Sequence, residues 1–371
     1  MNEKSKRISA LNGVKGWFIY FVVIYHIFNG TGIVADILAP IKNYGGFIVN
    51  YLFFMLSGFL TAYSFSVKKS KDRNFFGYIK GKLVRLYPLY LISNLWMLGY
   101  DVYIKLTTFK VSFLILVLTM QTGGSITDSY PYNVPCWFIC TLMVCYIVHY
   151  LIRHLCKDDA KKYMWVYYGM FVLGLVLLRN SYNIAFLYNH NGEGFTNFFL
   201  GCILFEHYRL FKNNKKILYP LFLCGLLLMI FPNTRQYIGD ARYLVIFIIC
   251  PVTILLSLEN RIVNKFFSCK LSQILGKISM CVFFIHTTGP LYNLPSYFSN
   301  YNVGFLVYIL VVIVSSLIIT FLLEKIPTWI EKIKLKINKK NTKTKGKDKS
   351  SDKAKKIDDI YNMSYNTLDF D

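Results

Sequence analysis

Two histidines lie in stretches that are otherwise almost wholly apolar. His26 follows the run VKGWFIYFVVIY, and His286 follows SMCVFFI. A neutral imidazole can take the proton of a hydroxyl group as that group attacks an electrophilic carbon, so either ring could serve as a general base. The structural alternative is a neutral ring that is hydrogen-bonded to a carbonyl or a serine of another helix. We expect a functional role for His26, whereas for His286 the two roles are equally open.

Lys15 shares one face of the expected helix with His26. The interval of eleven residues advances a helix by about 1100°, which is three turns plus about 20°, and by about 16 Å. Asn12 and Asn29 stand three residues outside the pair and extend this polar stripe. In a membrane-spanning helix, His26 would lie near the middle of the bilayer. Ionisable groups at that depth are energetically costly and usually mark a site.

A further pair of cations stands at the start of another apolar stretch. Lys82 and Arg85 lie on one face of the expected helix, and Pro88 fits its first turn. Lys and Arg flank membrane helices on the cytoplasmic side, and this accounts for the charges of 68–73. Lys82 and Arg85 directly adjoin the apolar stretch, where two cations can hold a phosphate or pyrophosphate group.

Membrane helices must position these residues. The chain has 371 residues, of which 55% are hydrophobic and only 16% are charged, whereas a soluble domain carries about 25% charged residues. A bilayer core requires about 20 apolar residues per helix, and runs near this length recur. We therefore predict an all-α polytopic membrane protein with ten spans. The expected spans are 14–33, 44–67, 86–104, 136–155, 163–180, 195–211, 217–231, 242–258, 271–289 and 303–325.

The distribution of Lys and Arg predicts the orientation. With ten spans and a cytoplasmic N-terminus, 36 of the 42 Lys and Arg residues fall on the cytoplasmic side and six fall outside. Cytoplasmic flanks of membrane helices carry such an excess, so both termini are expected inside a multi-pass plasma-membrane protein. The same rule accounts for the net charge of +23, which therefore does not indicate a nucleic-acid partner.

The chain divides into a membrane module, expected over 1–330, and a tail over 331–371. The tail is predicted to begin as a basic amphipathic helix on the inner leaflet and to become disordered. Residues 111–121 are too short to span and are predicted to be re-entrant or interfacial. The nine cysteines are interpreted as small hydrophobes. Three histidines near cytoplasmic helix ends are expected to be solvated: His149, His154 and His207.

Six stretches, in their order and spacing, carry a resemblance to a known family. They are Leu11–Gly16 with His26, Phe53–Phe59, Lys82–Pro88, Trp137–Ile139, Gly276–His286 and Glu324–Pro327. Together they resemble the integral-membrane acyltransferase 3 family over about residues 10 to 330. In that family a Leu-Asp-Gly-Leu-Arg-Gly run precedes a histidine, a Phe-Phe-x-Leu-Ser-Gly-Phe helix follows, and an Arg-x-x-Arg pair precedes Tyr-Pro. The resemblance implies ten spans and the transfer of an acyl group, most often acetyl, to envelope carbohydrates.

The sequence departs from the family pattern at several positions. Asn12 stands where the family has Asp, and Lys15 and Lys82 stand where it has Arg. Each cation is kept, but Lys lacks the bidentate fork that Arg offers to phosphate. Met280 and Cys281 stand where a Tyr is usual. These departures indicate a diverged branch of the family and leave the acceptor open.

The resemblance implies acetyl-CoA as the donor and His26 as the base. Lys15, Lys82 and Arg85 are predicted to hold the phosphates of the donor at the cytoplasmic side, with no metal. Stabilisation of the oxyanion is assigned to two donors, Ser57 and Asn29. For Ser57, which precedes Gly58, the alternative role is close helix packing.

The acceptor is expected to be a carbohydrate, either polymeric or linked to a lipid. Trp137 and His286 are predicted to contact it, and membrane lipids surround the protein. For Trp137 the alternative is anchoring at the outer interface, where aromatic residues are common. His190, in an expected outer loop, could touch a substrate, but nothing in the sequence singles it out. Acyl chain length, the side of the membrane that the acceptor occupies and the oligomeric state are left open.

Two other function classes are weighed against acyl transfer. A transporter or flippase for a lipid-linked saccharide would need no chemistry, but only Cys250–Pro251 indicates a broken helix and no internal repeat is found. A transferase with a lipid-linked donor usually needs acidic residues and a metal. Four acidic residues lie in loops or at span ends with no evident pairing: Asp101, Asp128, Glu193 and Asp240.

Overall fold

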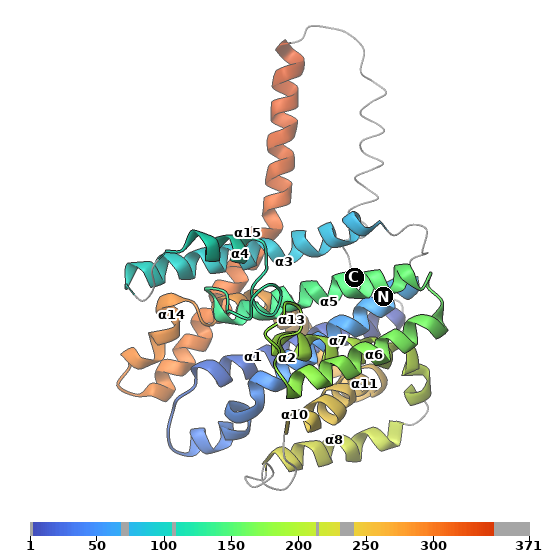
Figure 1. The fold of residues 1–371 in the computed structure, drawn as a ribbon. Coiled ribbons are helices and arrows are strands. Elements are labelled where there is room, and N and C mark those ends of the chain that lie inside the picture. The colour runs from blue at the N-terminus through green and yellow to red at the C-terminus, as the bar shows by residue number, and fades with distance from the viewer. Residues whose placement is uncertain (1–2, 68–73, 106–108, 213–214, 231–240, 345–371) are drawn as a thin grey trace. The chain divides into compact units, whose positions relative to one another are not determined.

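The computed structural model describes residues 3–67, 74–105, 109–212, 215–230 and 241–344, which contain helices and no strand. The chain forms two units, Met1–Ser316 and Leu317–Asp371, and the first contains every predicted site residue. The helices (Figure 1) are α1 Glu3–Ile27, α2 Ile33–Val67, α3 Phe75–Tyr103, α4 Val111–Leu118, α5 Trp137–Leu155, α6 Ala160–Arg179, α7 Asn189–Lys212, α8 Lys215–Ile230, α10 Ala241–Leu244, α11 Cys250–Glu259, α12 Arg261–Phe267, α13 Lys270–Ile285, α14 Gly289–Asn293 and α15 Tyr301–Thr344. Short turns of helix, η2 Val134–Cys136, η3 Val245–Ile249 and η4 Leu294–Tyr297, join some of them.

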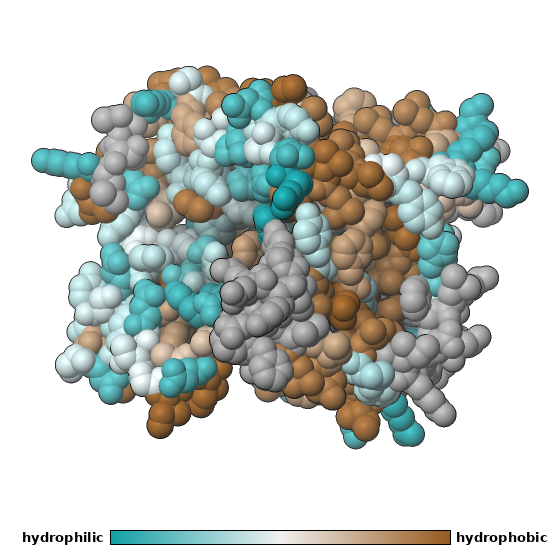
Figure 2. Space-filling view, turned by 60° about the horizontal axis from the view of Figure 1, so that its bottom comes forward, coloured by the Kyte–Doolittle hydropathy of each residue, from teal (hydrophilic) through white to brown (hydrophobic). Residues whose placement is uncertain are grey.

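Five helical segments of the described residues are long and apolar enough to cross a membrane. They are Ser9–Ile27, Ile33–Val67, Val134–Leu155, Arg242–Glu259 and Tyr301–Lys325. A sixth is obtained if α12 and α13, which meet at a bend of 59°, form one broken span. Each of the ten expected spans overlaps a helix, and Figure 2 shows apolar side chains over much of one face. These features are those of a helical membrane protein.

The first helix is shorter than the sequence predicts. α1 ends at Ile27 rather than at residue 33, so His26 lies in its last turn and not midway along a span. Gly32 adopts a φ of 72°, a left-handed conformation that favours glycine and helps to turn the chain into α2. Asn29 therefore lies beyond the helix, and the predicted stripe ends at His26.

Two further expectations are corrected, and one lies outside the described residues. His149 is fully buried rather than solvated, because its ring packs between Phe65 and Tyr167. The second helix begins at Ile33 rather than at residue 44. The disordered tail was predicted within 331–371; α15 is helical to Thr344, and 345–371 are outside the described residues.

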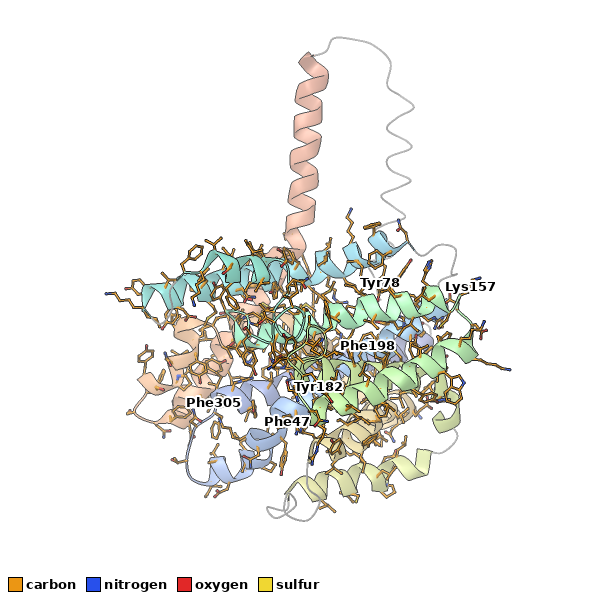
Figure 3. All side chains as sticks on the ribbon, in the orientation of Figure 1. Phe47, Tyr78, Lys157, Tyr182, Phe198 and Phe305 are labelled. Carbon is orange, nitrogen blue, oxygen red and sulfur yellow. The ribbon has the colours of Figure 1, made fainter. Side chains whose placement is uncertain are left out.

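Glycines bring the central helices of the first unit into backbone contact. A Cβ atom at Gly16 of α1 would collide with the backbone at Gly276 of α13. On another pair of helices, a Cβ at Gly58 of α2 would collide with the carbonyl of Phe198 in α7, a buried residue that Figure 3 labels. Small residues allow membrane helices to approach closely. The α1–α13 and α2–α7 crossings are therefore fixed at van der Waals contact.

Candidate active site

The two histidines of the apolar stretches lie together. Their ring centroids are 5.4 Å apart, with 46° between the ring planes. His26 is in the last turn of α1, and His286 follows the last residue of α13. The glycine crossing of α1 and α13 holds these two helix ends side by side. The structure thus unites a residue predicted to be the base with one predicted to contact the acceptor.

The hydrogen bonds of His286 define its tautomer. Its Nδ1 lies 2.8 Å from the carbonyl oxygen of Phe283 and 3.2 Å from that of Val282. A carbonyl only accepts, so Nδ1 carries the proton and Nε2 carries the lone pair. The ring is fully buried, and Nε2 has no hydrogen-bond partner among the described residues. His286 therefore offers one open acceptor beside His26.

A buried polar network holds the chain around His286. Asn133 donates from Nδ2 to the carbonyl oxygen of Phe284 at 2.7 Å, and its Oδ1 accepts from the Thr287 hydroxyl at 2.9 Å. The backbone N–H of Asn133 donates to Oδ1 of Asn94 in α3 at 3.0 Å. The Tyr308 hydroxyl donates to the carbonyl of His286 itself at 2.6 Å. This network could not be predicted from the sequence, because its members lie far apart along the chain.

His26 is half-buried, and no hydrogen bond to its ring nitrogens is found in the described part of the chain. The edge of its ring meets the ring of Tyr25, with 4.9 Å between centroids. Its imidazole is therefore held by ring contacts on two sides while its nitrogens stay open to a substrate.

A lysine that the sequence analysis overlooked fixes the end of α1. Nζ of Lys42, on α2, donates to the carbonyl oxygen of Tyr25 and to Oδ1 of Asn29, both at 3.1 Å. A cation is favourable at a helix C-terminus, where the last carbonyls lack partners. The hydroxyl of Tyr301 donates to another of these carbonyls, that of Ile27. Asn29 is thus held by Lys42 at an exposed position close to His26 in the sequence.

The three predicted phosphate ligands also converge. The positive charges of Arg85 and Lys82, on α3, both act on Lys15 of α1. Nζ of Lys82 lies 4.7 Å from the ring centroid of Tyr146 and 5.5 Å from that of Tyr78, which gives the cation two aromatic faces. Lys15 and Lys82 are half-buried, whereas Arg85 is exposed. Three positive charges this close together repel one another, and a bound anion would relieve this repulsion.

Ser57 belongs to this group of cations and not to the pair of histidines. Its hydroxyl lies near that of Tyr146, on which the charge of Arg85 also acts. Gly46 of α2 packs against Tyr25, and Ser57 lies eleven residues further along the same helix, about 16 Å away. The two predicted oxyanion donors are therefore separated: Asn29 lies at the His26 end of the site and Ser57 at the cationic end.

Trp137 is buried rather than open at a surface. Its side chain is only 8% exposed, and the ring of His190 stacks on it at 4.3 Å with 18° between planes. Nε2 of His190 lies 3.7 Å from Oδ1 of Asp128, and the ring of Tyr130 meets His190 edge-on at 5.1 Å. Trp137 thus supports a cluster of polar side chains behind the loop that contains Asp128 and Tyr130. Asp240 lies outside the described residues.

Comparison with known proteins gives one match. Residues 8–325 match the model of a family described as an acyltransferase domain. The matched range includes both histidines, all three cations and the cluster around His190. No curated protein and no solved structure matches the chain.

Proposed function

The chain belongs to the acyltransferase 3 family, whose model matches it over residues 8–325, and from this premise we propose that it transfers an acetyl group from acetyl-CoA to a hydroxyl of an envelope carbohydrate. The observation that carries the proposal is the arrangement along α1. This one helix presents Lys15 to a group of cations and, eleven residues later, presents His26 beside His286. A site for an anionic donor and a site for proton transfer thus lie about 16 Å apart along α1.

The donor end consists of Lys15, Lys82 and Arg85. Coenzyme A is strongly anionic, and its phosphates would neutralise three cations that otherwise repel one another. Ser57 and the Tyr146 hydroxyl lie beside these cations and can line the path of the pantetheine arm. The arm then runs along α1 so that its thioester reaches His26.

The chemical end consists of His26, with Asn29 at its side. As the acceptor hydroxyl attacks the thioester carbonyl, its proton passes to a ring nitrogen of His26 and a C–O bond forms. The tetrahedral intermediate then expels the CoA thiolate, which takes the proton from His26 and leaves as the thiol, so the base is restored. The amide N–H of Asn29 is the nearest assigned donor for the developing oxyanion. The lone pair on Nε2 of His286 can accept the N–H of His26 or the acceptor hydroxyl.

The topology that serves this reaction has ten spans with both termini in the cytoplasm of a plasma-membrane protein. Support comes from the 36 Lys and Arg residues that this orientation assigns to the cytoplasmic side. It brings cytosolic acetyl-CoA to Lys82 and Arg85, and it opens the His26 end to a carbohydrate outside. The transporter alternative would use the same helices, but it does not explain why two imidazole rings lie together at the ends of α1 and α13.

The O-acetyl content of envelope carbohydrate tests the proposal. We would measure it by proton NMR before and after mild base, in cells that express wild type, no protein, His26→Ala or His154→Ala at matched membrane abundance. His154 is an exposed histidine and serves as the matched control. We expect the ester to vanish without the protein and with His26→Ala, and to persist with His154→Ala. Esters that survive in cells lacking the protein would contradict the proposal and favour a transporter.

A further inference from the structure

A cluster of polar side chains lies beside the histidine pair and has no part in the reaction described so far. We call it the outer polar cluster; its members are Asp128, Tyr130, His190, Asn191 and Glu193. The first two lie in the loop between α4 and η2, and the others form the first turns of α7. The charges of Glu193 and Asp128 both act on Tyr130, and Asp128 contacts His190, so the members face one another.

Several polar atoms of the cluster are buried without a hydrogen-bond partner. Asn191 is fully buried, and neither its Oδ1 nor its Nδ2 is bonded to any described residue. The same holds for Oε2 of Glu193 and Nδ1 of His190, two residues that are each only 9% exposed. Proteins rarely leave buried polar atoms unpaired, and those that are left usually meet water or a ligand. The cluster thus has donors and acceptors to offer to a molecule that enters it.

The backbone around the cluster is already ordered. The Thr141 hydroxyl of α5 donates to the carbonyl oxygen of Gly123 at 2.6 Å, and the N–H of Gly123 donates to the carbonyl oxygen of Ser129 at 2.9 Å. Gly124 has a φ of 102° and leaves no room for a Cβ atom beside Oδ1 of Asn191. The loop is therefore held to α5 and to itself by hydrogen bonds, and it packs against Asn191 of α7. A preformed site loses less entropy when a ligand binds.

The protonation states of the cluster limit what it can bind. Burial lowers the pKa of His190 to about 4 and raises that of Glu193 to about 7, the latter against the charge of Arg242. Burial also raises the pKa of Asp128. Because the pKa of His190 is lowered, the five side chains of the cluster include no cation at neutral pH, and the charge of Arg242 acts on Glu193. Among the described residues, no three His, Cys, Asp or Glu side chains form a metal site. Such mixed donors and acceptors match hydroxyl groups.

The cluster is continuous with the base. Tyr25 lies near Tyr130, and the ring of Tyr25 contacts that of His26. Asp128 and Tyr130 form the open edge, because the side chain of Asp128 is 37% exposed and Tyr130 is 50% exposed. A ligand held at this edge would therefore have one end at the surface and the other near His26.

We propose that the outer polar cluster binds the acceptor, and that it takes the hydroxyl groups of an uncharged saccharide segment. Asn191 and Glu193 pair with hydroxyl groups at the inner end, and Asp128 and Tyr130 hold the segment at the edge. Trp137 acts through His190, whose ring it supports, and is a positioning residue. This inference rests on the proposed function, because it assigns that reaction's second substrate to a site.

Steady-state kinetics with the natural acceptor test the assignment. The acceptor is the envelope carbohydrate of the same cells, freed of esters by mild base, and the protein is the full chain in lipid nanodiscs. Asn191→Ala removes both unpaired amide atoms, and Asp128→Asn makes a milder change at the partly exposed edge. Matched controls are Asn180→Ala, an exposed amide at the end of α6, and Asp36→Asn, an exposed carboxylate at the start of α2.

We expect both cluster variants to raise the KM for the carbohydrate at least tenfold. The KM for acetyl-CoA, and the slow release of thiol without acceptor, should stay within twofold of wild type. The two controls should leave all three values unchanged. An unchanged KM for the carbohydrate in a folded cluster variant would overturn the proposal. If Asn191→Ala fails to fold, Asp128→Asn decides alone.

A separate experiment tests whether the bound saccharide is neutral or acidic. Partial acid hydrolysis of the same carbohydrate, followed by anion exchange, yields neutral and acidic fragments, and each pool is tried as a competitor of transfer. Inhibition by the neutral pool that Asp128→Asn weakens supports the proposal, whereas inhibition by the acidic pool alone overturns it. If wild type releases no thiol from acetyl-CoA, with or without acceptor, the proposed function fails. Direct binding of the neutral pool then tests the cluster: binding that Asn191→Ala abolishes supports the site, and equal binding refutes it.

Discussion

The imidazole of His286 lies 5.4 Å from that of His26, centroid to centroid, with its one unbonded nitrogen buried. Its other nitrogen is held by two backbone carbonyls of α13, so the ring cannot turn without losing these bonds. The network of Asn133, Thr287 and Tyr308 fixes the backbone beneath it. His26 therefore faces a rigid hydrogen-bond acceptor of known tautomer, and this relationship has consequences for the rate of reaction.

Removal of each histidine should affect turnover to a different degree. His26→Ala should lower kcat by about 10²- to 10⁴-fold, the usual contribution of a general base. His286→Ala should lower kcat by less, because His286 orients a proton and does not take it, and both variants should keep the wild-type KM for acetyl-CoA. Measurements of kcat and KM over a range of pH check this. A changed KM for acetyl-CoA with normal kcat would place His286 in the donor site instead.

The cations should matter only for the phosphate-bearing part of the donor. Lys82→Ala or Arg85→Ala should raise the KM for acetyl-CoA about tenfold or more, since a hydrogen bond to a charged group contributes about 1.5–3 kcal/mol. The same variants should treat S-acetylpantetheine, which lacks the nucleotide phosphates, as wild type does. Lys80→Ala, an exposed lysine of the same helix, is the control. Equal losses with both donors would contradict a phosphate site.

The glycine crossing of α1 and α13 should be intolerant of a single methyl group. Gly16→Ala should destabilise the protein by about 1–3 kcal/mol, because the added Cβ meets backbone that cannot yield easily. It should also lower kcat, since it pushes apart the helices that hold His26 and His286. Gly99→Ala, where an added Cβ has no neighbour within 4 Å, should change neither thermal stability nor kcat. A loss of stability with kcat intact would show that the histidines do not depend on this crossing.

Glu193 should make stability depend on pH. Its pKa is raised from 4.5 to about 7, chiefly by burial, so between these values the folded state keeps a proton that the unfolded state has lost. Stability from this group therefore falls as pH rises from about 4.5 to 7. Glu193→Gln should match wild type at pH 4.5 and exceed it at pH 8 by on the order of 3 kcal/mol. Thermal unfolding in detergent at both pH values measures this.

The stability of Glu193→Gln must be compared with that of the wild type at each pH, because His190 changes the free energy of unfolding with pH in the opposite direction. Its pKa is lowered by burial, so its contribution to stability is lost as pH falls from 6.5 to about 4. Both proteins contain His190, so its contribution cancels in the difference between their free energies of unfolding. A difference that is the same at pH 4.5 and at pH 8 would show that Glu193 is not a buried acid.

The sequence singled out side chains that the structure brings into two groups, but it did not show at which levels along the helices they lie. Spacing and family resemblance identified His26, His286, Lys15, Lys82 and Arg85, because these break an apolar pattern, and the structure brings them into two groups. Periodicity could not locate the end of α1, which depends on a left-handed glycine and on Lys42 from the next helix. Asn29 and Ser57 were consequently assigned to one task although they lie at opposite ends.

Contacts between distant segments were not predictable from one sequence. Asp128 and Glu193 are 65 residues apart and show no pairing in the sequence, yet both act on Tyr130 once α7 packs behind the α4–η2 loop. The role of Asn133 in holding the backbone around His286 was not predictable either, because an asparagine close before a proline is common in turns of many kinds. Helix positions follow from local apolar pattern, whereas these polar clusters depend on how the helices pack.

The continuity of α1 from Lys15 to His26 also bears on which mutations the protein can accept. One inserted residue between them would rotate His26 by about 100° and displace it by about 1.5 Å, which no change of side chain repairs. Replacement of an Arg by Lys at position 15, in contrast, keeps the charge at its place. The number of residues between Lys15 and His26 therefore sets both their distance and their relative orientation on α1. Apart from Gly16, which the contact with α13 requires, residues of this interval should change among related proteins while its length stays constant.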